Sequence, residues 1–518
     1  MINLNFSHFI SYNINNKHLF FLFSILLCLF LFSQTINAQE TKIVKLIKAD
    51  KLIGIKKSGE EVNILNGNIE LEHDSTLFFC DSANLYKSAN TLDAFGNVHI
   101  IVNDSVDIFG DVLYYDGNTK IAEIHNHVKL IDEKATLTTN HLKYFRKTKT
   151  AYYYTGGKII DKENQLTSLK GYYFTDKKEF FFKDSVVVIN PDYVMYSDSL
   201  MYNTKTEIIY FQGPSEINGK DDFMYCEDGW HDTQNDISLL KIKAFITHKH
   251  NSLYGDTIFY DKEKGYGKAI NNISISDTIK DMMVKGNFAE YFKEAGFSYI
   301  TDSATAIIID NSDSLFIHSD TIKVVFDSTK KVKTLFAYYK TKYYREGMQG
   351  MCDSLVYEIQ DSTISMYKTP VLWTEENQLS ADSIKIVTEN NQLDSIVFYN
   401  SAFIISQDDT NKFNQVKGKL IVAYFKDNEI KKLTVNGNSE SLYFVRDENK
   451  NLTGIKKAVS SNILIYLENR KMKTITYIGN PKTPMYPPKD LSPKDLILRN
   501  FIWLDEKRPK SVSDIYIW

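Results

Sequence analysis

The sequence is poor in the residues that interrupt or cross-link a chain. It contains nine prolines, and six of them lie between residues 481 and 509, so residues 1–480 hold three. Because proline has no backbone N–H, a long stretch with so few prolines keeps almost every donor that an extended hydrogen-bonded structure needs. Only four of the 518 residues are cysteine, which excludes a disulfide framework as the main source of stability.

Three of the four cysteines occupy equivalent places in a repeat that is described below. They are Cys80, Cys226 and Cys352, and more than a hundred residues separate each from the next. Neighbouring strands lie only about 4.8 Å apart, so cysteines on such distant repeats cannot pair with one another. We therefore expect three unpaired thiols packed in the interior.

The sequence also lacks the short motifs of common catalytic sites. It has no Gly-x-Ser-x-Gly, His-Glu-x-x-His, phosphate-loop or dinucleotide-binding pattern, so we expect no enzyme, no catalytic residue and no cofactor. Two His-x-His pairs, His125/His127 and His248/His250, have no further ligand at a helpful spacing, and we expect solvated residues rather than a metal site. Basic and acidic residues nearly balance, 61 against 65. The sequence has no basic stripe of the kind that binds nucleic acid, so we expect no nucleic acid partner.

The N-terminus carries the pattern of an export signal. Lys17 and His18 precede an apolar run from Leu19 to Phe32, and the run ends in the polar, small-residue stretch 33–38. The run is short for a membrane span, which favours a cleavable signal peptide over residues 1–38. A retained N-terminal anchor is the alternative.

A short phrase recurs along the rest of the chain. It consists of Asp, then Ser or Thr, then an apolar and aromatic run, as in 80–86, 197–202, 255–260 and 352–357. A second phrase, Gly-Asn followed by an apolar residue, occurs at Gly67 and 29 residues later at Gly96. Self-similarity with a period of about 30 residues is typical of a stacked repeat architecture.

Within each repeat, apolar residues alternate with polar ones. Ile69 and Leu71 share one side of their segment, and Val98 and Ile100 share one side of the next. This period of two, with 33 tyrosines in the chain, predicts β-strands with one buried face. The predicted fold is all-β, a repetitive β-jelly-roll or β-solenoid of stacked short strands with about 13 rungs of ~30 residues. At about 4.8 Å per rung, the stack would be roughly 60 Å long.

The recurring Asp has a simpler explanation than catalysis or calcium binding. Asp followed by Ser or Thr favours turns, because these side chains bond to their own backbone. We therefore expect the phrase to form the turn that starts each rung. The Pro-rich tail 481–518 is expected to cap the last open edge of the stack, and docking on a partner is the alternative.

Together these phrases resemble the OstA-like proteins of lipopolysaccharide transport. The resemblance rests on residues 48–52 (Lys-Ala-Asp-Lys-Leu), on the strand starts at Gly67 and Gly96, and on the Asp-x-Leu-x-Tyr returns. It implies an open, V-shaped β-jelly-roll with an apolar groove along its length. We assign the OstA-like jelly-roll to residues 45–260, a continuation of the repeats to 261–480, and a tail or cap to 481–518.

The resemblance implies a non-enzymatic lipid conduit in lipopolysaccharide transport to, and assembly at, the outer membrane. The expected location is the periplasm, in association with the outer membrane. The expected partners are lipopolysaccharide and other transport proteins, joined through end-to-end stacking of strands. Two alternatives stay open: a structural or adhesive cell-surface solenoid, and a carbohydrate-active β-helix enzyme. The evenly spread Asp positions argue against the enzyme.

The residues expected to line the lipid groove are the inward apolar positions of successive repeats. They are Ile69, Leu71, Val98, Ile100, Val128, Ile159, Val186 and Val188.

Overall fold

The computed structural model describes residues 42–518 except 58, 103–105, 133–134, 162, 280, 311–312, 330, 390–391, 428 and 469–470. The predicted signal peptide, residues 1–38, lies outside this range. Within the described residues, no helix has both the length and the apolar character that a membrane span needs.

The described residues fold into strands, with three short 3₁₀ helices near the end of the chain. The strands of the first half are β1 (Lys45–Lys48), β2 (Lys51–Lys57), β3 (Glu60–His73), β4 (Thr76–Tyr86), β5 (Thr91–Val102), β6 (Val106–Asp116), β7 (Ile121–Asp132), β8 (Ala135–Phe145), β9 (Thr150–Tyr153), β10 (Gly157–Asp161), β11 (Asn164–Ser168), β12 (Lys170–Phe174), β13 (Glu179–Ile189), β14 (Tyr193–Asn203), β15 (Ile208–Gly219), β16 (Asp222–Asp232), β17 (Ile237–His248) and β18 (Asn251–Asp261).

The later strands are β19 (Tyr266–Asp277), β20 (Met282–Phe292), β21 (Phe297–Asp310), β22 (Asp313–Phe326), β23 (Val332–Arg345), β24 (Met348–Glu358), β25 (Thr363–Tyr367), β26 (Val371–Thr374), β27 (Asn377–Ser380), β28 (Ser383–Glu389), β29 (Gln392–Asp409), β30 (Lys412–Lys426), β31 (Glu429–Arg446), β32 (Leu452–Glu468), β33 (Lys471–Ile478) and β34 (Met485–Tyr486). The 3₁₀ helices are η1 (Pro493–Leu496), η2 (Asp505–Lys507) and η3 (Val512–Tyr516).

All pairings of these strands are antiparallel, and strands that follow one another along the chain are stacked in space. β4, for example, pairs with β3 on one side and β5 on the other. One sequence repeat holds two strands, since β4 begins at Thr76, β6 at Val106 and β8 at Ala135. The predicted all-β repeat architecture is confirmed.

Most strands bend near their middle. In β4, Phe78 and Cys80 are buried, and beyond Asp81 the buried positions are Ala83 and Leu85. The inward-facing positions thus change from even to odd numbers at the bend, and the pairing with β5 shifts register there. A bulge of this kind turns a strand while keeping its apolar side inward.

The bend divides the stack into two arms that enclose one hydrophobic core. Arm A ends at an edge of mostly short turns, such as the turn at Asp74 and Ser75. Arm B ends at an edge of longer turns, such as residues 87–90.

The recurring Asp lies at this bend, in the middle of a strand. The prediction that it starts each rung was therefore wrong. The Asn97 side-chain amide donates to Asp81 at 2.8 Å, and the same contact joins Asn68 to Asp50 and Asn272 to Asp256. The Gly-Asn phrase of one strand and the Asp phrase of its neighbour thus form one corner.

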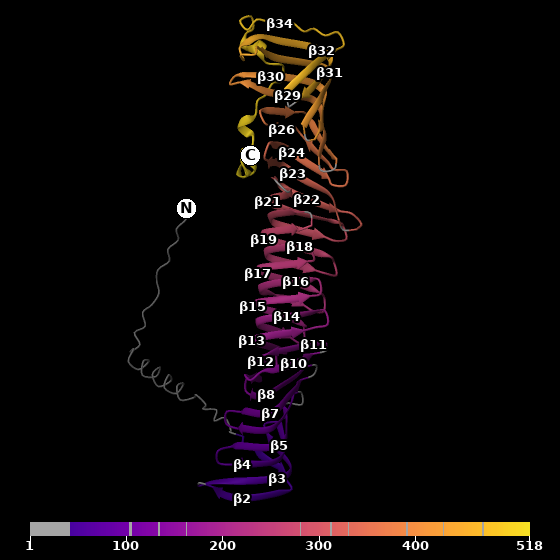
Figure 1. Cartoon of the computed structure of the whole chain (residues 1–518). Helices are drawn as coiled ribbons and strands as arrows, with labels where there is room; N and C mark the ends of the chain where they lie inside the picture. Colours follow the sequence, from indigo (N-terminus) through magenta and orange to yellow (C-terminus); the bar gives the residue numbers. More distant parts are fainter. Residues whose placement is uncertain are drawn as a thin grey trace, which may run out of the picture.

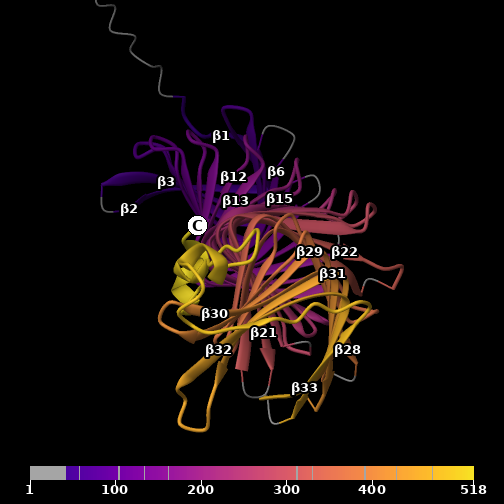
Figure 2. The ribbon, with the colours of Figure 1, turned by 90° about the horizontal axis from the view of Figure 1, so that it is seen from above.

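The stack is elongated, and successive strands fan around its axis (Figures 1 and 2). In the described residues, six layers are made of two shorter strands, one in each arm, so the 34 strands form 28 layers. At about 4.8 Å per layer, the stack is about 130 Å long. The length predicted from the sequence was too short, because each repeat adds two strands.

The tail does more than cap the last layer. β34 pairs with β32, and the chain then runs back along the outside of arm A until η3 lies against β22 and β23 (Figure 1). Three buried glutamines hold it there. Gln415 donates to the Leu496 carbonyl and accepts from the Leu498 N–H, at 2.8 Å each.

Gln378 makes the same pair of bonds with the Ile502 carbonyl and the Leu504 N–H, at 2.7 Å each. Gln349 accepts from Arg508 at 2.8 Å. Beneath the tail lies a second hydrophobic cluster that includes Phe444.

Candidate lipid-binding interior

One unbroken column of inward side chains runs along arm A. Its members are cross-strand partners from each strand to the next. The column therefore continues through the layers that consist of two shorter strands as well as through those that consist of one long strand. From β3 to β19 the column is Leu71, Phe78, Ile100, Ile108, Leu130, Leu137, Ile159, Leu166, Val188, Met195, Ile217, Met224, Ile246, Leu253 and Ile275.

All eight residues predicted to line a groove face this interior. Leu71, Ile100, Ile159 and Val188 belong to the column itself. The other four, Ile69, Val98, Val128 and Val186, lie one step nearer the bend. Each of the eight is at most 2% exposed. These side chains thus face inward and form a packed core. Their contact with lipid stays a prediction.

Large aromatic side chains fill the interior of the first half. Tyr173 and Phe180 stack with ring centroids 4.0 Å apart, and Phe182 lies 5.7 Å from Phe180. All three are buried. Apolar contacts of this density leave no room for a guest unless the two arms move apart.

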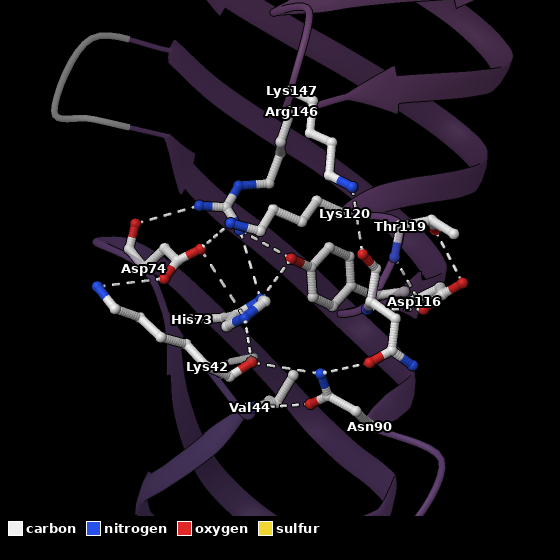
Figure 3. A network of polar contacts seen from close by, with 12 residues as sticks. Lys42, Val44, His73, Asp74, Asn90, Asp116, Thr119, Lys120, Arg146 and Lys147 are labelled. Carbon is white, nitrogen blue, oxygen red and sulfur yellow. Dashed lines mark hydrogen bonds and ion pairs between the residues drawn. The ribbon is translucent and has the colours of Figure 1, made fainter. Parts of the chain in front are cut away.

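Polar contacts tie the two edges together near the N-terminal end (Figure 3). Asp74, at the edge of arm A, forms an ion pair with Lys120 at the edge of arm B. Arg146 donates to the Asp74 carbonyl at 3.1 Å and to the Tyr115 hydroxyl at 2.7 Å. The hydrogen bond from Lys120 is the main reason that the pKa of Asp74 lies below its ordinary value.

His73 lies at the centre of this network, almost fully buried. Its Nε2 is 2.8 Å from the Lys42 carbonyl and its Nδ1 is 2.7 Å from the Tyr115 hydroxyl. A carbonyl can only accept, so Nε2 carries the proton and Nδ1 accepts from Tyr115. Burial holds the pKa of His73 below its ordinary value.

A second tie joins the edges four layers further on. The Asp132 carboxylate, whose side chain is fully buried, accepts from the Tyr173 hydroxyl at 2.5 Å and from Lys178 at 2.6 Å. Lys178 lies in a turn of the arm B edge. Sequence reasoning missed both ties, although a charged residue at the end of an apolar strand, as Asp132 is in 128–132, was a visible signal.

In the middle of the stack, the side chains of the column become partly exposed to solvent. The five column residues of β15–β19 are only partly buried, whereas those of β3–β14 are fully buried. We call these five the opened segment: Ile217, Met224, Ile246, Leu253 and Ile275. Facing inward beside them are small residues, among them Ala244, Gly255 and Ala269. Apolar side chains that are partly exposed to solvent can mark a site for an apolar ligand.

Other candidates from the sequence have structural roles. Cys80, Cys226 and Cys352 are unpaired and buried, as predicted, and burial raises the pKa of each thiol to about 12. Such thiols are inert at neutral pH.

The His-x-His pairs contact single side chains of neighbouring strands. His125 Nδ1 lies 2.6 Å from Nδ1 of His141. His127 contacts Asp111 at 2.8 Å, and His248 contacts Asp222. In the part of the chain that the structure describes, no group of three His, Cys, Asp or Glu residues could hold a metal ion.

Residues 40–198 match the sequence model of a family described as OstA-like protein. The resemblance predicted from the repeat phrases is confirmed for this part of the chain. No curated protein matches the chain.

One similar solved structure is that of LptH, described as the LptA homologous periplasmic component of the conserved lipopolysaccharide transport device from Pseudomonas aeruginosa. That match has 13% sequence identity and a TM-score of 0.19, and it covers 21% of this chain and 75% of the other.

Proposed function

We propose that this chain, whose residues 40–198 are OstA-like, is a periplasmic conduit in lipopolysaccharide transport to the outer membrane. Acyl chains would lie between the two arms, against the inward column, while the sugars stay outside. Residues 1–38 would direct export, and the protein would act without catalysis.

The continuous inward column is the observation that carries the proposal. Its members run without a polar break from Leu71 to Ile275. A track of equivalent apolar positions offers an acyl chain similar binding free energy at each step, which suits sliding rather than capture. The opened segment is the proposed entry, because its column residues are less buried than those of β3–β14, so that separating the arms there costs less apolar contact.

The ends of the stack suit contacts with further transport proteins. The first layer pairs with β3 and leaves Leu52, Ile53 and Ile55 exposed. We propose that a strand of another component adds to this layer, as strands add to open sheet edges.

Photo-crosslinking in cells that make lipopolysaccharide tests the conduit. A photoreactive residue at Val98, Val128 or Ile246 should yield lipopolysaccharide adducts. Matched outward neighbours at His99, Lys129 and Thr247 should yield few. Equal labelling of the two faces, or none at the inward positions, would refute the proposal.

A further inference from the structure

A stripe of apolar side chains also runs along the outside of arm B, where water rather than core is expected. Its members face each other in register on six consecutive strands, β13–β18. The outer stripe consists of Phe181, Met201, Tyr210, Trp230, Leu239 and Phe259. None of the six is fully buried, and five steps of about 4.8 Å give the stripe a length of about 24 Å.

Polar side chains flank the outer stripe on both sides. The column toward the bend includes Gln212, Asp228 and Lys241. The column toward the edge alternates, because Ile208 lies between Asn203 and Asp232 and Ile237 follows Asp232. The surface therefore combines a narrow apolar ridge with amide, carboxylate and ammonium groups along its length.

The width of the stripe argues against another folded protein as its ligand. A stable protein interface buries about 800 Å² on each partner, which a ridge one or two side chains wide does not supply. Nucleic acid is disfavoured because acidic residues such as Asp228 and Asp232 line the ridge and phosphates require net positive charge.

An extended peptide is disfavoured by the chain's own example. On arm A, Gln378 and Gln415 bind the backbone of the tail and Gln349 binds the Arg508 side chain. The three glutamines lie in alternate layers, with apolar residues between them. The outer stripe has an apolar residue in each of its six layers and no such amide within it.

We propose that the outer stripe binds the saccharide part of the transported amphiphile; this inference rests on the proposed function. Sugar rings have apolar C–H faces that pack on aromatic side chains, whose ring faces are electron-rich. Their hydroxyl groups donate and accept hydrogen bonds, which matches the exposed amide of Gln212 beside the stripe. A linear saccharide has both the width and the repeating character of the stripe.

The position of the stripe fits this role. β15–β18 carry four of the five residues of the opened segment on the inside of arm A. The same strands carry Tyr210, Trp230, Leu239 and Phe259 on the outside of arm B. A molecule whose acyl chains enter at the opened segment can pass its sugars over the arm B edge. The turns of that edge are polar there, for example residues 233–236.

Calorimetric titration of the full chain with lipid-free polysaccharide, released from lipopolysaccharide by mild acid, tests the inference. We expect binding, and we expect the double variant Tyr210→Thr/Trp230→Thr to lose about tenfold or more in affinity. Phe336→Thr is the matched control, since Phe336 faces outward in the same column of arm B between Lys323 and Val356. It should bind as the unmodified chain does.

The outcomes separate this inference from the conduit itself. If the polysaccharide does not bind while Ile246 still crosslinks to lipopolysaccharide, the stripe has no saccharide role and the conduit stands. If it binds while Ile246 gives no adduct, the conduit fails instead. If the double variant changes the oligomeric state in sedimentation and leaves polysaccharide affinity intact, the stripe is a subunit contact and the inference is overturned.

Discussion

A Cβ atom placed on Gly96 would lie 2.6 Å from a carboxylate oxygen of Asp81. Gly96 also has a φ of +75°, a conformation that glycine adopts without strain. The corner therefore depends on glycine twice, through its backbone angle and through the close approach of the Asp carboxylate. Gly67 stands in the same relation to Asp50, at 2.5 Å.

We predict that Gly96→Ala destabilises the chain by about 1–3 kcal/mol, because alanine at positive φ is strained and its methyl group displaces Asp81. Gly54→Ala is the control. Its nearest neighbour to an added Cβ is 3.9 Å away and its φ is not positive, so stability should hold. Urea unfolding of both variants checks this, and equal midpoints would show that the corner does not need glycine.

Much of the fold could be predicted from alternation alone. The inward positions of 69–71 and 98–100 followed from a period of two, because a strand with one buried face leaves no other arrangement. The Asp-Ser phrase was predicted to form a turn between strands, but it lies at the bend within a strand. The same local hydrogen bonds from Asp and Ser to the backbone stabilise both a turn and a bulge, so the phrase alone does not distinguish the two. The shift in the buried positions of β4, from Cys80 to Ala83, was the signal that distinguishes the two.

The contacts that close the structure could not be predicted in the same way. Asp74 meets Lys120 across 46 residues, and Gln415 meets Leu498 across 83. Local propensity carries no information on such pairs, and a glutamine at an outward strand position looks like any solvated residue. The tail was predicted as a cap for that reason.

Gln415→Ala should loosen the tail. The substitution leaves the Leu496 carbonyl and the Leu498 N–H without their partner, and an unpaired buried polar group costs about 1–3 kcal/mol. Hydrogen exchange at Leu498 should become faster and the segment after Gly479 easier to cleave with protease. Gln360→Ala, in an exposed turn, should change neither. Unchanged exchange at Leu498 in the Gln415 variant would mean that the glutamine does not hold the tail.

The stability of the chain should fall with pH below about 6.5, and His73 should account for part of the fall. The folded pKa of His73 is lowered from 6.5 by burial, so below 6.5 the unfolded state binds more protons. The contribution of neutral His73 to the free energy of unfolding is therefore fully present above pH 6.5 and is lost as the pH falls toward the folded pKa. Protonation would place an N–H on Nδ1, against the Tyr115 hydroxyl and Arg146.

Thermal unfolding of His73→Gln checks this. Glutamine can still donate to Lys42 and accept from Tyr115, so the variant should lose melting temperature less steeply between pH 6.5 and 5. Some slope should remain, since burial also lowers the pKa of His125, His231 and His318. Asp74 titrates outside this window, because its pKa is lowered from 3.8 and its contribution is lost only at more acid pH. A slope equal to that of the unmodified chain would contradict the role given to His73.

Ile246 and Ile108 belong to the same inward column, but Ile246 is partly exposed and Ile108 is fully buried. A carboxylate at Ile108 would be buried without a partner, so Ile108→Glu should unfold its part of the stack. At Ile246 the carboxylate can reach water, and Ile246→Glu should fold with an unchanged circular dichroism spectrum. It should nevertheless repel an acyl chain, so that a photoreactive residue at Leu253, which faces Ile246 in the next layer, loses its lipopolysaccharide adduct. Thr247→Glu adds the same charge on the outer face and should leave the adduct intact. Persistence of the Leu253 adduct in Ile246→Glu would mean that acyl chains do not pass through the opened segment.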